Sequence, residues 1–162
     1  MIHLQISKTQ NLYLNLLESI HAKFLVIGGF AVKAYCPDRN TSDLDILLFR
    51  LDPNLEKLAS LFEDKNPLNG RSWKDVLSSE NKRIAVPNES LTEVDLLTSI
   101  DGIDFENFYA NSIEVIAGDL IVKIPNLKDL ISMKMISKNS GNCHESHIQD
   151  ENDIRCLTKL LS

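Results

Sequence analysis

The chain has 162 residues, 43% of them hydrophobic, and a formal net charge of −6. This length and composition predict one globular domain over residues 1–162. Its apolar runs are far shorter than the roughly 20 residues that span a bilayer, so we expect no membrane contact. The negative charge argues against a broad grip on duplex nucleic acid, because that mode of binding depends on many contacts from lysine and arginine to phosphate.

The N-terminus and the cysteines bear on location. The opening residues MIHLQISKTQ lack the charged and then apolar pattern of a secretory leader. The three cysteines are unevenly spaced and predict no disulfide framework. We therefore expect a cytoplasmic protein in a reducing compartment.

Helical and strand patterns alternate along the chain, with Thr9 as a possible N-cap of the first helix and Asn126 as the cap of a later one. Gly118-Asp119 marks the turn of a hairpin. The polar stretches 65–82 and 139–149 predict loops. The predicted helices cover about 8–23, 30–36, 54–64, 105–111, 127–138 and 150–161, and the predicted strands cover 24–27, 43–49, 82–86, 91–98 and a hairpin over 112–124.

Two acidic residues open the predicted strand 43–49. Asp43 and Asp45 are two residues apart, so on a strand their side chains project to the same face about 7 Å apart. Like charges held together raise the free energy unless a cation neutralises them or one of them is protonated. The spacing therefore indicates a divalent metal site, and the alternative is a pair of solvated acids at a sheet edge.

The glycine pair Gly28-Gly29 follows the strand 24–27, where a phosphate could approach backbone N–H groups without meeting a Cβ atom. A third acid, Asp95, lies on a separate predicted strand. Together with Asp43 and Asp45 it fits a scheme in which carboxylates hold two Mg²⁺ ions over a nucleoside triphosphate. In this scheme Asp95 holds the metal nearer the attacking hydroxyl and accepts its proton.

The loop before the acidic strand carries three more polar candidates. Arg39 either contacts phosphate or pairs with a neighbouring acid. Thr41 and Ser42 carry hydroxyls at a loop end, where such groups usually orient or cap the start of the next element.

These residues resemble the nucleotidyltransferases of the DNA polymerase beta type. The resemblance implies a mixed central β-sheet flanked by helices, an α/β (α+β) fold, and a nucleotide bound near the glycines, Arg39 and the two loop hydroxyls. The pattern is GG-x-A, then R-x-T-x-D-x-D, then a later acidic strand, and it is carried by Gly28, Gly29, Ala31, Arg39, Thr41, Asp43, Asp45 and Asp95.

The second half of the chain is similar to a small bacterial branch related to abortive-infection-type nucleotidyltransferase toxins. That branch shows V-D-L-L, G-x-x-F, a hairpin and L-I-x-x-K, and it makes Lys134 the candidate for binding phosphate. The alternative for Lys134 is a solvated helix lysine. The branch continues with Gly-Arg-x-Lys-Asp-x-x-Asp, of which Asp150 and Asp153 match the acids. The preceding basic pair is missing, and Asp150 is the residue we assign to the nucleotide site.

The predicted function is Mg²⁺-dependent transfer of a nucleoside monophosphate from a nucleoside triphosphate to a hydroxyl acceptor, with release of pyrophosphate. A tRNA end, a protein or a small molecule could supply the hydroxyl. The alternative is a catalytically weak nucleotide-binding or partner-binding module, one half of a toxin–antitoxin pair. A homodimer or a partner protein could complete the cleft of so small a core.

A short cluster of Cys143, His144 and His147 has residue types that bind zinc. A closed zinc site needs four ligands, and only Glu145, Asp150 or the distant Cys156 could complete this one. We therefore favour a polar loop without metal over a zinc site.

Overall fold

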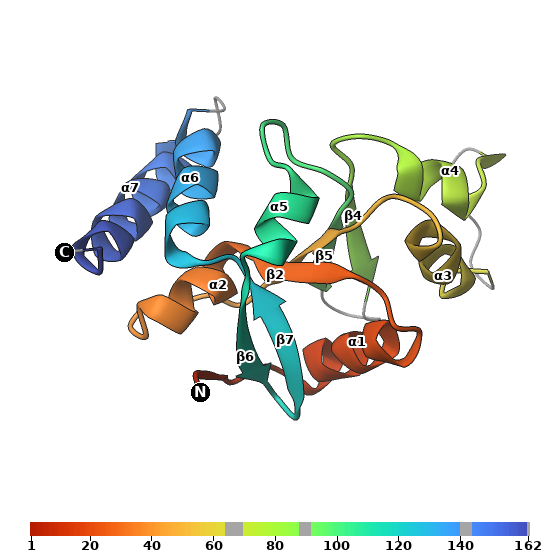
Figure 1. The fold of residues 1–162 in the computed structure, drawn as a ribbon, viewed down its shortest axis with the longest axis horizontal. Helices are drawn as coiled ribbons and strands as arrows, with labels where there is room; N and C mark the ends of the chain where they lie inside the picture. Colours follow the sequence, from red (N-terminus) through yellow and green to blue (C-terminus); the bar gives the residue numbers. More distant parts are fainter. Residues whose placement is uncertain (64–69, 88–91, 140–143, 162) are drawn as a thin grey trace.

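The computed structural model describes residues 1–63, 70–87, 92–139 and 144–161 (Figure 1). The larger of its two sheets has four strands in the order β2 (Phe24–Ile27), β3 (Leu44–Leu48), β5 (Thr92–Leu97) and β4 (Arg83–Pro87). β3 runs parallel to β5, and the other two neighbouring pairs are antiparallel. The sheet is therefore mixed, and β3 is one of its inner strands, as its apolar sequence predicts.

The second sheet has three strands. β6 (Ile113–Ala117) and β7 (Leu120–Ile124) form the predicted hairpin, and β1 (His3–Leu4) pairs in parallel with β6. The turn contains Gly118, whose φ of +62° lies in the left-handed region that favours glycine. The hairpin prediction is confirmed, whereas the two-residue strand β1 is not predicted by the sequence pattern.

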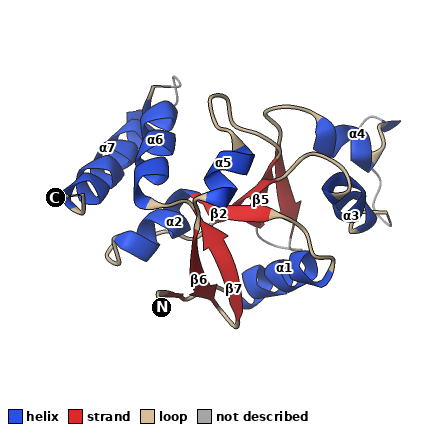
Figure 2. Cartoon of the chain, in the orientation of Figure 1, coloured by secondary structure: helices blue, strands red, loops and turns tan. Residues whose placement is uncertain are grey.

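Helices flank both sheets (Figure 2). The mixed sheets and their helices confirm the predicted α/β class. Within the described residues, no helix is long and apolar enough to cross a membrane. The helices are α1 (Lys8–Ser19), α2 (Gly28–Tyr35), α3 (Asn54–Ser60), α4 (Trp73–Ser78), α5 (Phe105–Ala110), α6 (Leu127–Lys138) and α7 (His144–Lys159).

The two faces of the four-stranded sheet are covered differently. One face belongs to the main core, where residues such as Val26, Ile46 and Leu96 pack with Leu14 of α1 and Leu58 of α3. The other face has a smaller cluster, made by Leu25, Ile27 and Leu47 with Met133 of α6 and aromatic residues of α5. Since side chains alternate along a strand, Asp45 lies on the same face as Leu47, the less covered one.

Several predicted boundaries move. α1 is capped by Ser7 rather than Thr9, because the Ser7 hydroxyl accepts from the backbone N–H of Gln10, whose side chain accepts from the Ser7 backbone N–H. Asn126 caps α6 as predicted. α3 ends at Ser60, short of the predicted 64, and residues 64–69 lie outside the described ones.

Two predicted loops contain helix. The stretch 65–82 includes α4, which starts at the N-cap Ser72 and packs Trp73 on Phe62 with ring centroids 4.7 Å apart. The stretch 139–149 includes the first turns of α7, which begins at His144 rather than at 150. The loop predictions were wrong over these helical residues because polar composition also suits the exposed side of a helix that packs by its other side.

The helices α6 and α7 lie side by side at one end of the molecule (Figure 1). Asp153 of α7 is 2% exposed and lies between two cations: its Oδ1 accepts from Arg39 Nε at 2.8 Å, and its Oδ2 lies 3.0 Å from Lys134 Nζ. Asp150, one turn earlier, lies 3.3 Å from Lys134 and accepts from the Ser137 hydroxyl at 2.8 Å. Buried charges thus connect α7 to α6 and to the loop after α2.

A disulfide joins the same parts of the chain. Cys36, directly after α2, is bonded to Cys156 of α7, with their Cα atoms 6.5 Å apart. The sequence prediction of no disulfide is wrong here, because spacing along the chain does not show which distant cysteines meet in the fold. The cytoplasmic location therefore loses its support from the cysteines and stays a prediction.

The buried ion pairs predict that Asp153→Asn destabilises the protein by about 3 kcal/mol, because two cations lose their partner in a site with little water. Urea unfolding of the variant and the wild type under identical redox conditions measures this change. Glu151→Gln on the same helix is the control, since Glu151 is half exposed and its pair with Lys138 should contribute less than about 1 kcal/mol. Equal unfolding free energies for all three proteins would contradict the assignment.

Candidate functional site

The site is built on the pairing of β3 with β5. In this parallel pair Asp45 lies directly opposite Asp95. Neighbouring strands are about 4.8 Å apart, so the two carboxylates are close on the same sheet face. Their side chains are only 22% and 14% exposed. Two of the three predicted acids are therefore brought together at the edge of a partly buried face.

Asp43 lies just before this pair. It is exposed and precedes β3, which begins at Leu44. Its charge still reaches Asp45, since it contributes to raising the pKa of that residue. The predicted strand 43–49 is therefore one residue shorter at each end, and Asp43 lies just outside it.

Gly28 gives the Asp45 carboxylate its room. A Cβ atom on Gly28 would collide with Oδ2 of Asp45 and would stand 3.1 Å from its Cγ. Gly28 also has a φ of +66°, a conformation that residues with a side chain rarely adopt. It opens α2 without a side-chain cap. At Gly29 the constraint is contact alone, because a Cβ there would stand 2.8 Å from Cβ of Thr41.

Arg83 of β4 bridges the two carboxylates. Its Nη1 atom donates to Asp95 Oδ2 at 2.6 Å and to Asp45 Oδ1 at 3.4 Å. The antiparallel pairing sets Ala85 opposite Asp95, and Arg83, two residues earlier, projects to the same face. A cation of the chain itself therefore lies between the acids.

Burial raises the pKa of Asp45 to about 6. Arg83 opposes this rise, Asp95 and Asp43 add to it, and Lys134 lowers the pKa again. The electrostatics thus favour either a proton or a cation at Asp45, as the sequence predicts for acids held close together.

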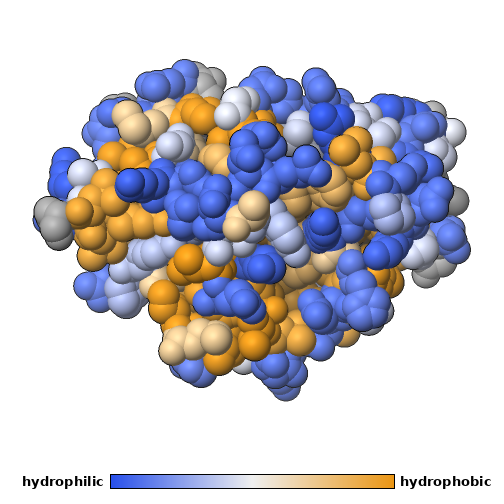
Figure 3. Space-filling view, viewed as in Figure 1, coloured by the Kyte–Doolittle hydropathy of each residue, from blue (hydrophilic) through white to orange (hydrophobic). Residues whose placement is uncertain are grey.

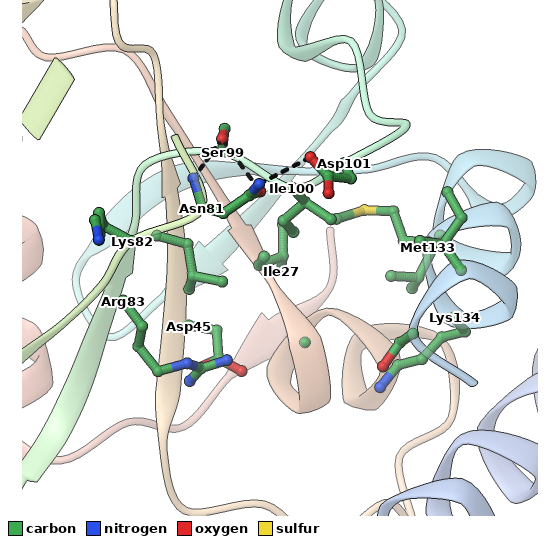
Figure 4. A pocket seen from close by; sticks show the side chains of 15 residues that line it. Ile27, Asp45, Asn81, Lys82, Arg83, Ser99, Ile100, Asp101, Met133 and Lys134 are labelled. Atoms are coloured by element: carbon green, nitrogen blue, oxygen red, sulfur yellow. Dashed lines mark hydrogen bonds and ion pairs between the residues drawn. The ribbon is translucent and has the colours of Figure 1, made fainter. Parts of the chain in front are cut away.

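A pocket of about 390 Å³ opens beside the carboxylates. Figure 4 shows Arg83 and Asp45 on one side of it and Lys134 of α6 on the other. Ile100, Met133 and Ile136 contribute an apolar wall. The pocket therefore combines acids, cations and apolar surface.

The far part of the pocket is polar. Asn81 donates from its side chain to Asp101 Oδ1 at 2.9 Å, and its backbone N–H donates to the Ser99 hydroxyl at 2.9 Å (Figure 4). These bonds join the residues before β4 to the loop after β5. None of these three residues, nor Arg83, is predicted from the sequence, because their placement depends on how β4 pairs.

The remaining predicted nucleotide-binding residues have other partners in the structure. Arg39 pairs with Asp153, which is the second of the two alternatives that its sequence context left open. Lys134 lines the pocket while it pairs with Asp150 and Asp153, so it is not a solvated helix lysine. Ser42 is exposed and its carbonyl accepts from Gln10. Asp150 lies behind Lys134, 5% exposed.

The residues present suit a divalent cation in one respect. The guanidinium of Arg83 is a positive group already bound by Asp45 and Asp95, and carboxylate oxygens are the ligands that Mg²⁺ prefers. Among the described residues, no group of three or more His, Cys, Asp or Glu side chains is assembled to hold a metal ion. Asp45 and Asp95 are the two carboxylates that could hold Mg²⁺, with Asp43 adjacent.

The zinc interpretation gains no support within the described residues. Cys143 lies outside them, Cys156 is bonded to Cys36, and Nε2 of His147 is buried without a hydrogen-bond partner. His147 lies within α7 rather than in the expected polar loop.

No protein-family model matches the chain, and no curated protein matches it either. Among solved structures, it is similar to the crystal structure of an antigenic nucleotidyltransferase-like protein from Paracoccidioides brasiliensis. The TM-score is 0.56 and the identity 14%, over 96% of this chain and 78% of that chain. The chain has a nucleotidyltransferase-like fold. Identity this low shows the fold alone, so the relation to toxins stays a prediction.

The contact at Gly28 predicts that Gly28→Ala destabilises the protein more than Gly70→Ala does. Both glycines have a positive φ, near +70°, but a Cβ at position 70 would meet nothing within 4 Å. Both variants should lose about 1–2 kcal/mol from backbone strain. Gly28→Ala should lose at least about 1 kcal/mol more, because Asp45 must shift. Urea unfolding measures both, and equal losses would contradict the contact.

The raised pKa of Asp45 predicts how Asp45→Asn changes stability with pH. In the wild type the carboxyl prefers its proton in the folded state, a stabilising effect present below about pH 4 and lost as pH rises through about 6. Two pKa units correspond to about 2.7 kcal/mol. This shift already includes the opposing attraction of Arg83, so at pH 8 Asp45→Asn should stabilise the fold by about 2–3 kcal/mol.

Unfolding free energies from pH 4 to pH 8 test this dependence, and the difference between variant and wild type should shrink towards pH 4. Asp119→Asn is the control, because Asp119 lies exposed in the hairpin turn. A gap that is constant with pH would contradict the assignment.

Proposed function

We propose that the protein is a Mg²⁺-dependent nucleotidyltransferase, which moves a nucleoside monophosphate from a nucleoside triphosphate to a hydroxyl acceptor. The observation that carries the proposal is the pair Asp45 and Asp95, held in register at the edge of a pocket that also contains Arg83 and Lys134. The nucleotidyltransferase-like fold supports it.

In the proposed reaction the acceptor hydroxyl attacks the α-phosphorus, the bond from that phosphorus to the bridging oxygen breaks, and pyrophosphate leaves. Mg²⁺, with two ions expected, would be held by Asp45, Asp95 and the adjacent Asp43, and would neutralise negative charge on the phosphates. The Asp95 carboxylate accepts the hydroxyl proton. Lys134, on the opposite wall, is the cation for the phosphates.

The remaining pocket surface suits the nucleoside. Ile100, Met133 and Ile136 provide apolar contact for a base, and the polar groups of Asn81 and Asp101 can bond its edge. The N–H groups at the start of α2, beside Gly28 and Gly29, are the predicted platform for the triphosphate.

The acceptor can be a tRNA end, a protein hydroxyl or a small molecule, and a second subunit can help to bind it. Figure 3 shows apolar surface over the C-terminal end of α7 and over the β6–β7 hairpin. Leu160, Leu161 and Ile121 are about half exposed there. A second subunit of the predicted homodimer, or a partner protein, could pack against these two apolar areas.

A nucleotide-binding module with weak catalysis, in a toxin–antitoxin pair, is the second candidate. The ion pairs of α7 favour this candidate, because they occupy the two cations predicted to bind phosphate. Arg39 is bound to Asp153, and Lys134 is bound to both Asp150 and Asp153. Under this alternative the protein binds nucleotide with Mg²⁺ but transfers it inefficiently.

The proposal predicts that the wild type, incubated with Mg²⁺, cell extract and each α-labelled nucleoside triphosphate, gives a covalently labelled product. Asp45→Asn and Asp95→Asn should lower the rate at least about 100-fold, because the charge that they stabilise arises in the reaction. Asp119→Asn should leave it unchanged. Mass spectrometry then identifies the labelled acceptor as RNA, protein or small molecule.

Calorimetry separates the two candidates. Binding of a nucleoside triphosphate with Mg²⁺, but no labelled product from any extract fraction, supports the binding module. Full transfer by Asp45→Asn, or no binding of any of the four triphosphates by the wild type, contradicts the transferase.

A further inference from the structure

Neither the sequence pattern nor the similarity of fold assigns a role to Arg83, which lies between the two acids. One nitrogen, Nη1, contacts both Asp95 and Asp45, instead of two nitrogens forming a fork on one carboxylate. It therefore acts as a single positive charge between two acids, in the position a bridging cation would take. The side chain is 57% exposed, so leaving this position costs little burial.

Two other cations near the pocket are already held by carboxylates, whereas Lys82, which also lines the pocket, is exposed and projects to the opposite side of the chain from its neighbour Arg83. Lys134 is 12% exposed and is shared by Asp150 and Asp153, and Arg39 is held by Asp153. The basic pair expected before Asp150 is replaced by a sequence that has Gln149 in the nearest position, and the Gln149 side chain donates to Asp153. The C-terminal helices thus use much of their charge to hold themselves together, and a bound triphosphate needs a second cation besides Lys134.

We infer that Arg83 is this cation: a divalent metal takes its place between Asp45 and Asp95, and the released guanidinium binds the triphosphate. The inference rests on the proposed function for the identity of the anion. A divalent ion has twice the charge of a guanidinium and neutralises two carboxylates better. The released side chain remains attached to β4 at the pocket wall, and a guanidinium fits phosphate oxygens with two parallel bonds.

This role predicts that Arg83→Gln changes the affinities for metal and for polyphosphate in opposite directions. Without the internal competitor, Mn²⁺ alone should bind about fivefold more tightly. With saturating Mg²⁺, inorganic tripolyphosphate should bind at least about tenfold more weakly, because one charge-assisted contact is lost. Tripolyphosphate is used because it carries no base, and isothermal titration calorimetry measures both affinities.

Two further variants sharpen the test. Arg83→Lys keeps a positive charge but not the planar fork, so it should keep the weak Mn²⁺ binding of the wild type and recover only part of the tripolyphosphate affinity. Arg50→Gln is the matched control: Arg50 is also an arginine paired with an acid, Glu80, and it does not line this pocket. It should change neither affinity, and unfolding curves check that all variants fold.

Opposite shifts in Arg83→Gln support the inference, even if the protein transfers no nucleotide, in which case only the proposed function fails. Unchanged Mn²⁺ affinity overturns the competition, and unchanged tripolyphosphate affinity overturns the anion contact. If both affinities fall together, Arg83 has a structural role and the inference is overturned. If neither the wild type nor Arg83→Gln binds Mn²⁺, both the inference and the proposed function are overturned.

Discussion

The register of β3 against β5 is the constraint on which the site depends. It sets Asp45 beside Asp95 on a sheet face that is only partly open to water. Two carboxylates in that position repel each other and have lost part of their hydration, so the free energy of the fold rises unless something positive joins them. Three neighbouring features reduce this electrostatic and steric cost. Arg83 supplies a charge, Gly28 leaves room for the Asp45 oxygen, and the Asp45 pKa rises.

A second group of charges is neutralised by residues of the chain itself and does not need a ligand. Asp153 and Asp150 of α7 are buried, but Arg39 and Lys134 neutralise them and Ser137 adds a hydrogen bond. The Cys36–Cys156 bond crosses the same contact between the end of α2 and α7. The two helices are therefore fixed relative to the sheet, and this places Lys134 and Met133 on the pocket wall.

Much of this arrangement follows from sequence pattern and part does not. Apolar runs and turn residues predict β2 and the β6–β7 hairpin, and Asn126 predicts the start of α6, because these signals are local. The acids Asp45 and Asp95 are predictable as members of one site, since an acid in an apolar strand indicates a special environment, but the pair that the spacing predicts is Asp43 with Asp45. Arg83 is not, because its role depends on the register of β4, which no local signal fixes.

The lengths of α4 and α7 were also beyond prediction. Polar residues at 72–79 and 144–149 suit a loop as well as a helix, and packing against the core selects the helix, as with Trp73 on Phe62. Likewise, Arg39 pairs with an acid of α7 that lies more than a hundred residues later in the chain. Lys134 pairs with acids of the same helix about 16–19 residues later. Sequence shows that such cations need an anion, but only the fold decides whether it is a phosphate or a carboxylate.

The charge pattern has a consequence for how ligands act on each other. A cation alone that binds Asp45 and Asp95 leaves Arg83 without its partners, and an anion alone that attracts Arg83 leaves the two acids facing each other. Either ligand by itself breaks an existing pair, whereas a cation and an anion together replace every contact that is lost. Because binding free energies are linked reciprocally, the metal must raise the affinity for the anion by the same factor as the anion raises it for the metal. Under the proposed function, such a site would favour a metal–triphosphate complex over its separate parts, through the chain's own ion pairs.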